Sequence, residues 1–266
     1  MSVKKEPSFF TDWVGGVREL ADYEALFSHC CGANMAVGEA STGYLYDPNA
    51  PSKIFELLGG VRIIIILRNP VDMSFALWRH MRRIGKRGEG LPFRGALDAE
   101  PARIADPSFN GYERESWYAN FHYFNRALYH EQVSRYIDTF GRENVRVYLF
   151  EEFRKDPLKT CRDLYSFIGV DPDFTPGLEA QNVGVDVRHR GLGKLVKAPP
   201  APLKMASKVL PGGLVSGVKG MMTRLNTRPT PKLDEALRKE LVERYRPDVL
   251  KLSALIGKDL TGWLAP

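Results

Sequence analysis

The chain is poor in cysteine and contains no long apolar run. Three of its 266 residues are cysteines, Cys30, Cys31 and Cys161. This odd number, with two neighbours in sequence, excludes a disulfide framework and a Cys-x-x-Cys metal site and favours reduced thiols. The most apolar run, residues 63–67, is far shorter than the roughly 18 residues of a membrane span. No apolar stretch follows the lysines near the N-terminus, as a signal peptide would require, so we expect the protein in the cytoplasm.

Acidic residues are scarce in one segment of the chain. Lys and Arg exceed Asp and Glu by 38 to 32 overall, a formal net charge of +6. Residues 181–232 contain ten Lys or Arg and a single acid, Asp186, a net charge of +9 that leaves −3 for the rest. We expect one domain over 1–266, in which 181–232 form a basic insert of loops and short helices and 233–266 a C-terminal helix. The surplus of cations suggests anionic partners.

The apolar pattern and the turn signals predict an α/β fold. A β-branched run over 61–67, with two glycines before it, predicts a fully buried parallel strand. Asn69 and Pro70 then fit the start of a helix over 71–84. Further predicted elements are a short strand over 35–39, a long aromatic-rich helix over 116–140, a strand over 145–150, a helix opened by Asp156 and Pro157 and ended by Gly169, and an amphipathic helix with a short closing segment over 231–264. Strands separated by helices indicate a parallel sheet with helices on its faces.

The turn after the strand over 61–67 is a candidate anion site. Carboxyl ends of parallel strands and helix N-termini are places where such folds bind phosphate or sulfate. Arg68 stands at the strand end and can grip an anion with two hydrogen bonds, and Ser74 adds a hydroxyl about one turn into the helix. The alternative is that Arg68 caps the helix or pairs with Asp72, and the pattern alone does not separate the two.

Two further segments carry polar residues among aromatics. In Lys5-Glu6-Pro7-Ser8-Phe9-Phe10, Glu6 stands beside a cation and two aromatic residues and could act as a general base. The alternative is a solvated Lys-Glu pair near a terminus. The segment from Gly38 to Tyr46 could line a ligand at a strand end, or it could be a simple turn.

Taken in chain order, the segment Lys5 to Phe10, the segment Gly38 to Tyr46 and the strand, turn and helix over 61–84 resemble the sulfotransferase family. The resemblance is in particular to its heparan-sulfate-like and bacterial branch. That branch contains a Lys-Glu-Pro-x-Phe-Phe segment, then Gly-Glu-x-Ser-Pro-x-Tyr-Leu, then a buried strand that ends in Arg-Asn-Pro-Val-Asp. Further matching segments are Tyr129-His130-Glu131-Gln132, Val147 to Phe153, Asp156-Pro157, Phe167-Ile168-Gly169-Val170 and Gly257 to Leu264. The resemblance therefore spans nearly the whole chain.

The resemblance implies a P-loop-like three-layer sandwich with a central parallel sheet. It also implies a reaction, the transfer of the sulfuryl group of 3′-phosphoadenylyl sulfate (PAPS) to a hydroxyl or amine of a small-molecule, glycan or lipid acceptor, with no metal. By the same resemblance, Arg68 binds the 3′-phosphate of the nucleotide, and Glu6 is the base that acts on the acceptor. Ser74, from its place on the helix after Arg68, is a further candidate for contact with the nucleotide. Arg188 or Arg190 in the basic insert would contact the nucleotide.

Several positions depart from the family pattern. No Gly-Lys-Ser/Thr loop occurs, because Gly85-Lys86, Gly193-Lys194 and Gly257-Lys258 continue with Arg, Leu and Asp. The family places such a loop before the Lys-Glu-Pro segment, so we expect the first βα unit to be missing and the chain to be impaired or inactive. The family serine eight residues after the arginine is Ala76 here. Ser74 lies roughly 200° from that position around a helix and does not replace it simply.

Other functions remain as alternatives at this point. One is a non-catalytic remnant that binds an anion or a nucleotide. A P-loop nucleotidase is disfavoured by the missing phosphate-binding loop. Nucleic-acid binding by 181–232 is not expected, because aromatic residues do not alternate with its cations. Contact of residues 195–222 with a membrane surface is suggested only by their alternation of Lys and apolar residues. The acceptor and the oligomeric state have no signature in the sequence.

Overall fold

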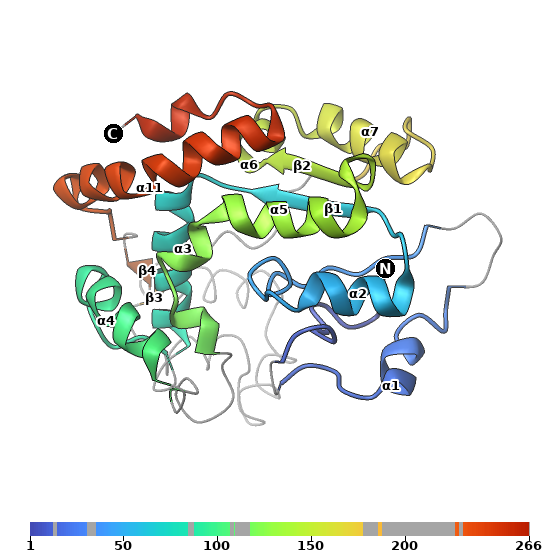
Figure 1. Cartoon of the computed structure of the whole chain (residues 1–266), viewed down its shortest axis with the longest axis horizontal. Coiled ribbons are helices and arrows are strands. Elements are labelled where there is room, and N and C mark those ends of the chain that lie inside the picture. Colours follow the sequence, from blue (N-terminus) through green and yellow to red (C-terminus); the bar gives the residue numbers. More distant parts are fainter. Residues whose placement is uncertain are drawn as a thin grey trace, which may run out of the picture. The chain divides into compact units, whose positions relative to one another are not determined.

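The computed structural model in Figure 1 describes most of the chain. The described residues are 1–12, 15–30, 36–84, 88–106, 109, 118–177, 186–187, 227–228 and 231–265. The chain divides into two units, one of residues 1–177 with 234–266 and one of residues 178–233. The second unit has nearly the bounds of the predicted basic insert. The prediction of a single domain stays a prediction.

Helices separate and flank the two strands of the first unit, as expected of an α/β protein. In chain order they are α1 (Leu20–Ala25), α2 (Ala50–Leu58), β1 (Ile63–Leu67), α3 (Pro70–Arg83), α4 (Phe93–Ala105), the 3-10 helices η2 (Tyr118–Phe121) and η3 (Asn125–Ala127), α5 (Tyr129–Phe140), η4 (Arg142–Asn144), β2 (Val145–Leu149), α6 (Phe150–Lys155), α7 (Pro157–Ile168), α11 (Glu235–Ile256) and η5 (Thr261–Leu264).

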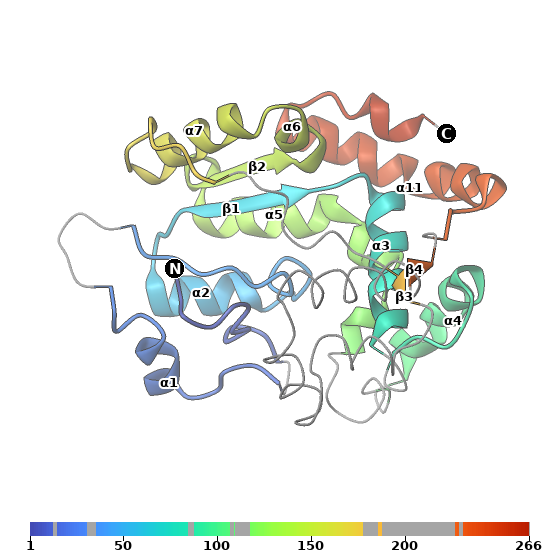
Figure 2. The same cartoon turned by 180° about the vertical axis from the view of Figure 1, so that it is seen from behind.

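The sheet of the first unit consists of β1 and β2 in the described part of the chain. The two strands are parallel, with Ile63 opposite Val145 and Leu67 opposite Leu149, so both end at the same edge. Helix α5 lies in front of β1 in Figure 1 and behind it in Figure 2, and it covers one face of the sheet. The prediction of a fully buried strand is wrong. Ile65 and Leu67 are buried, but Ile64 and Ile66 on the other face are 38% and 54% exposed, because no described layer covers that side.

The predicted helix starts are confirmed where a side chain caps the helix. Asn69 accepts hydrogen bonds from the backbone N–H groups of Val71 and Asp72 and opens α3. Asp156 does the same for α7, and Gly169, in the left-handed region at φ 75°, ends it. An aspartate at position 234 opens α11, the predicted C-terminal helix. Each of these caps satisfies backbone donors that a helix leaves unpaired at its first turn.

The predicted long helix over 116–140 is wrong, because tertiary contacts interrupt it. The buried carboxylate of Glu100 accepts hydrogen bonds from the N–H groups of Phe124 and Asn125, at 2.7 and 2.8 Å. The side chain of Gln132 donates to the carbonyls of Asn125 and Leu128. Asp248 on α11 accepts from the N–H of Tyr129, so α5 begins only there. These side chains replace the backbone hydrogen bonds that a continuous helix would make.

Buried polar groups join α4 to the segment 118–127. Arg103 makes two hydrogen bonds to the carboxylate of Glu89, at 2.7 and 3.2 Å. The same carboxylate accepts from the Tyr123 hydroxyl and from the N–H of Leu91. Burial raises the pKa of Glu89, but these hydrogen bonds and the charge of Arg103 outweigh it and hold the pKa below its usual value. We call Glu89, Glu100, Arg103 and Tyr123 the scaffold cluster.

Two further predictions concern short strands and membrane segments. Residues 36–39 form no strand, and residue 35 of the strand predicted over 35–39 lies outside the described residues. The second unit contains β3 (Asp186–Val187), paired antiparallel with β4 (Thr227–Arg228). No helix among the described residues is long and apolar enough to cross a membrane. The segment 195–222, with its alternating Lys and apolar residues, lies outside the described residues.

Candidate active site

Arg68 stands where β1 ends and the chain turns into α3. Its guanidinium lies over the ring of Phe150, 5.4 Å from the ring centre, where β2 has also ended. Its backbone N–H donates to the hydroxyl of Tyr129, which is buried at the start of α5. The Nε atom of Arg68 is buried and has no hydrogen-bond partner among the described residues. Arg68 therefore keeps unused hydrogen-bonding capacity at the edge where α/β proteins bind ligands.

The N-terminus of α3 itself offers less than the sequence predicts. The N–H groups of Val71 and Asp72 are taken by the Asn69 side chain, at 3.0 and 3.3 Å, and the N–H of Asn69 donates to Glu151 at 3.0 Å. The expected free N–H groups at this turn are thus already paired. The alternative prediction, a pair between Arg68 and Asp72, is wrong, because Asp72 pairs with Arg238 on α11. An anion at this edge would depend mainly on the Arg68 side chain.

Ser74 faces the interior of its own helix bundle. It is fully buried, and its hydroxyl donates to the carbonyls of Pro70 and Val71, at 3.0 and 3.1 Å. Tyr245 of α11 lies against the same hydroxyl. The hydroxyl would have to leave these partners to reach a ligand, so its predicted contact with the nucleotide gains no support from this geometry and stays a prediction.

Glu6 lies in a turn whose backbone conformation is uncommon for residues other than glycine. Glu6 and Ser8 have φ values of 51° and 54°. The turn is held from several sides, since Ser8 donates its N–H to Ser41 at 3.0 Å and Val17 donates its N–H to the Pro7 carbonyl at 2.8 Å. A side chain at Gly16 would meet the Ser8 carbonyl oxygen at 2.6 Å. Strain of this kind persists only where the surroundings fix it, and it is concentrated at functional sites.

The segment 38–46 supplies the partners of that turn. Glu39 accepts hydrogen bonds from the hydroxyls of Ser41 and Tyr44, and Ser41 in turn accepts from the N–H of Ser8. Thr42 donates its hydroxyl to the Glu6 carboxylate at 3.0 Å. Burial raises the pKa of Glu39, the nearby charge of Glu6 adds to the rise, and the two hydroxyls oppose it. Two segments that the sequence singled out separately therefore form one structure.

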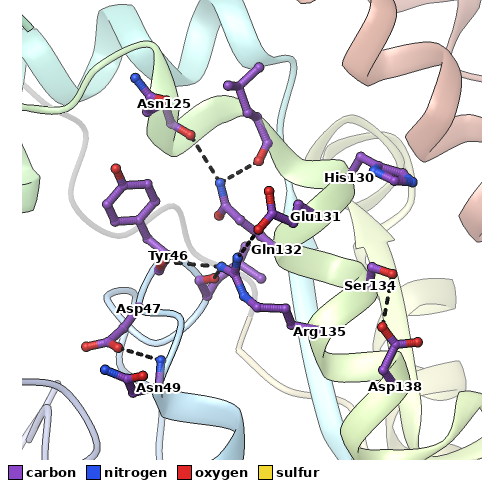
Figure 3. A network of polar contacts seen from close by, with 12 residues as sticks. Tyr46, Asp47, Asn49, Asn125, His130, Glu131, Gln132, Ser134, Arg135 and Asp138 are labelled. Atoms are coloured by element: carbon purple, nitrogen blue, oxygen red, sulfur yellow. Dashed lines mark hydrogen bonds and ion pairs between the residues drawn. The ribbon is translucent and has the colours of Figure 1, made fainter. Parts of the chain in front are cut away.

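The loop that follows is fastened to α5, as Figure 3 shows. Arg135 donates to the carbonyl of Tyr46 at 3.4 Å and pairs with Glu131 at 3.1 Å on its own helix. Asp47 accepts from the N–H of Asn49 at 2.9 Å and turns the chain into α2. Tyr136, also on α5, donates its hydroxyl to the carbonyl of Tyr44. These contacts hold the loop over 44–49 against α5, the helix that covers one face of the sheet.

Arg126 contacts the segment that holds the Glu6 turn. Its guanidinium donates to the Thr42 carbonyl at 3.4 Å and to Asn120 at 2.7 Å, and it lies 5.7 Å from the ring centre of Tyr46. Burial lowers the pKa of Arg126 to about 10, against the opposing effect of the Glu6 charge. The side chain thus stays a cation at neutral pH. No motif pointed to Arg126, since it lies in a segment that the pattern predicts to be a helix.

Arg188 and Arg190, the other predicted nucleotide contacts, lie outside the described residues. Among the residues that the structure describes, no group of three or more His, Cys, Asp or Glu could hold a metal ion. The described site thus consists of Arg68 and Glu6, which the sequence singled out, and of Arg126, which it did not. Arg68 stands at the edge where both strands of this P-loop-like α/β fold end, and Arg126 and Glu6 both contact Thr42.

Comparison with known proteins agrees with this class. The profile of the sulfotransferase domain matches residues 50–182, a span that contains Arg68. A crystal structure of a sulfotransferase from Alicyclobacillus acidocaldarius is 30% identical in sequence and superposes with a TM-score of 0.70, covering 99% of this chain and 87% of that one. No curated protein matches the chain at a significant level. The chain belongs to the sulfotransferase family, and membership implies a sulfonate donor as co-substrate.

Proposed function

We propose that the protein transfers the sulfuryl group of PAPS to a hydroxyl or amine of an acceptor. The observation that carries the proposal is the buried Nε of Arg68, which has no partner among the described residues and lies at the strand ends, inside the span that matches the sulfotransferase domain. Thr42 donates its hydroxyl to the Glu6 carboxylate and accepts from Arg126 at its carbonyl. We assign the guanidinium of Arg68 to a phosphate and the carboxylate of Glu6 to the base.

The roles follow from the chemistry of the transfer. Arg68 binds the 3′-phosphate of the donor through its unpaired Nε and the rest of its guanidinium. Glu6 accepts the proton of the acceptor as the new O–S or N–S bond forms. The bond between sulfur and the phosphate oxygen breaks, and 3′,5′-adenosine diphosphate (PAP) leaves with the electron pair. Arg126 adds positive charge beside the reacting groups, which favours a transition state whose negative charge is spread over oxygens.

The first test is binding of PAP to the purified chain, by calorimetry and thermal shift. A ligand that binds only the folded state adds about 2.7 kcal/mol of stability at 100 times its dissociation constant. Stoichiometric binding is expected, together with PAPS-dependent labelling of acceptors from a ³⁵S donor. PAP binding without transfer to any acceptor would favour a non-catalytic nucleotide-binding protein. No PAP binding by a folded sample would overturn the proposal.

A further inference from the structure

Glu39 is a half-buried carboxylate that lies beside the Glu6 turn, residues 6–10. Its two oxygens accept hydrogen bonds from two different hydroxyls. Oε2 accepts from Ser41 at 3.0 Å, and Oε1 accepts from Tyr44. Among the residues that the structure describes, no Lys, Arg or His forms an ion pair with it. The roles assigned so far make no use of this carboxylate.

The two hydroxyls in turn accept hydrogen bonds from the backbone of the turn. Ser41 accepts from the N–H of Ser8 at 3.0 Å, and Tyr44 accepts from the N–H of Phe10 at 3.5 Å. A hydroxyl has a single proton to donate. Because Glu39 takes the proton of each hydroxyl, only lone pairs remain to face the two N–H groups. Glu39 therefore sets the direction of both hydrogen bonds that hold the turn.

The turn depends on such support, because its backbone conformation is strained. Glu6 and Ser8 have φ values of 51° and 54°, and residues other than glycine keep such values only where their surroundings hold them. The hydrogen bond to Ser41 anchors Ser8 directly, two positions after Glu6. The residue after Ser41, Thr42, donates its hydroxyl to the Glu6 carboxylate at 3.0 Å. The segment that Glu39 orders thus holds both the backbone and the side chain of the proposed base.

A carboxylate at position 39 is costly, and an uncharged residue would not do the same work. Burial raises the pKa of Glu39, and the charge of Glu6 raises it as well, against the two hydroxyl donors. Glu89, which builds the fold, has the cation of Arg103 beside it, whereas Glu39 has none among the described residues. An amide of the same size has one oxygen and an NH₂ group that only donates, so it cannot take the protons of both hydroxyls.

We propose that Glu39 is a positioning residue, which holds the base Glu6 in its working orientation. It acts through the hydroxyls of Ser41 and Tyr44 and touches neither the donor nor the acceptor. The inference rests on the proposed function, because it takes Glu6 as the base. Loss of the Glu39 carboxylate should therefore slow the transfer step without weakening the binding of PAP or of the acceptor. It should matter only as long as Glu6 is present.

The first test is a double-mutant cycle between Glu39→Gln and Glu6→Gln. Transfer from ³⁵S-labelled PAPS is measured at pH 8 with phenol, cyclohexanol and benzylamine as acceptors. In Glu39→Gln we expect kcat to fall about 10- to 100-fold, the effect of a misplaced catalytic group, with KM and PAP affinity within about twofold of the wild type. In the Glu6→Gln background the same change should alter kcat by less than about twofold, because no base is left to position.

The matched control is Asp163→Asn. Asp163 on α7 accepts a hydrogen bond from the hydroxyl of Tyr148 at 2.7 Å, so the variant makes the same chemical change outside the Glu6 turn. Its kcat should equal that of the wild type. An unchanged kcat in Glu39→Gln, or an equal loss of kcat with and without Glu6, would overturn the proposal, because a merely structural role predicts the latter.

A second variant covers the case in which Glu39→Gln does not fold. Ser41→Ala keeps the Glu39 carboxylate and breaks only its link to Ser8. We expect kcat to fall again while PAP affinity stays unchanged, and no further fall when Glu6→Gln is added. A wild-type kcat in Ser41→Ala would contradict the proposed link.

A further measurement requires no turnover. Hydrogen exchange at the backbone N–H of Ser8 is followed by NMR of ¹⁵N-labelled protein. Exchange should be about tenfold faster in Glu39→Gln than in the wild type, and unchanged in Asp163→Asn. Equal exchange in Glu39→Gln and the wild type would overturn the proposal. If PAP does not bind, or no acceptor is sulfated, the proposed function fails, and exchange at Ser8 alone decides whether Glu39 holds the turn.

Discussion

Two buried polar regions of the molecule differ in how completely they are paired. In the scaffold cluster, both oxygens of Glu89 and both oxygens of Glu100 accept hydrogen bonds from described partners. By contrast, Nε of Arg68, Nε of Arg135 and Nε2 of His122 are buried without any among the described residues. A saturated network holds elements together, whereas leftover capacity costs stability unless a ligand uses it. The scaffold cluster therefore builds the fold, and the proposed phosphate contact depends on the unpaired Nε of Arg68 at the strand ends.

The largest expected effect is on catalysis. Glu6→Gln keeps the shape of the side chain and its contact with Thr42 but removes the base. We expect kcat to fall by about 10²–10⁴-fold, the range for general-base catalysis, with little change in PAP affinity. Transfer assays and calorimetry measure the two effects. Glu24→Gln, on the exposed face of α1, is the control. An unchanged rate in Glu6→Gln would remove Glu6 from the mechanism.

The scaffold cluster should respond in stability instead. Arg103→Met leaves the carboxylate of Glu89 buried without its cation, which costs about 3–5 kcal/mol in such pairs. At about 2–4 °C per kcal/mol for a chain of this size, the melting temperature should fall by roughly 10 °C. The matched variant Arg94→Met breaks an ion pair with Glu240 at the surface, and its melting temperature should not measurably differ from that of the wild type. Equal melting temperatures for the two variants would mean that burial of the pair is unimportant.

Arg68 should affect binding rather than folding. Arg68→Ala removes a charged hydrogen-bonding group worth about 2–3 kcal/mol, so PAP should bind about 30- to 150-fold more weakly. The control is Arg62→Ala, at the opposite end of β1, where Arg62 lies over the ring of Phe167. Calorimetry of both variants separates a local phosphate contact from a general effect of charge. If both lose affinity alike, the phosphate site is elsewhere.

The smallest effect is a pH dependence due to His122. Its pKa is lowered from 6.5 to about 4 by burial and by Arg126 and Arg103. Folding therefore favours the neutral form, so the stability from this group is complete above pH 6.5 and is lost as the pH falls toward 4. At pH 5 the loss is about 2 kcal/mol. Urea unfolding of wild type and His122→Phe at pH 7 and 5 should show a smaller loss for the variant. Parallel curves would contradict the lowered pKa.

Local signals in the sequence predicted much of the fold correctly. Asn69 with Pro70, and Asp156 with Pro157, mark helix starts because capping depends on residues a few positions apart. The run at 63–67 marks a strand, and its parallel partner at 145–149 followed from the same kind of pattern. The burial of that strand was not predictable, because exposure of Ile64 and Ile66 depends on which elements cover the sheet.

The site was predictable only in part. Glu6 and Arg68 stood out through their neighbours in sequence and through the family resemblance. Arg126 did not, because within an aromatic-rich segment it has the pattern of an ordinary helix residue. Its role arises where Thr42 and Tyr46 contact it, and both lie more than 70 residues away in the chain.

The α/β class, the family and the candidates Glu6 and Arg68 could be read from the amino-acid sequence alone, since they rest on periodicity, caps and ordered motifs. The start of helix α5 and the pairing of the buried polar groups could not, because hydrogen-bond satisfaction is a property of the folded surroundings. Glu100 and Asp248 redirect a backbone that would otherwise continue as one helix, and Tyr46 takes one nitrogen of His122 while leaving the other unpaired.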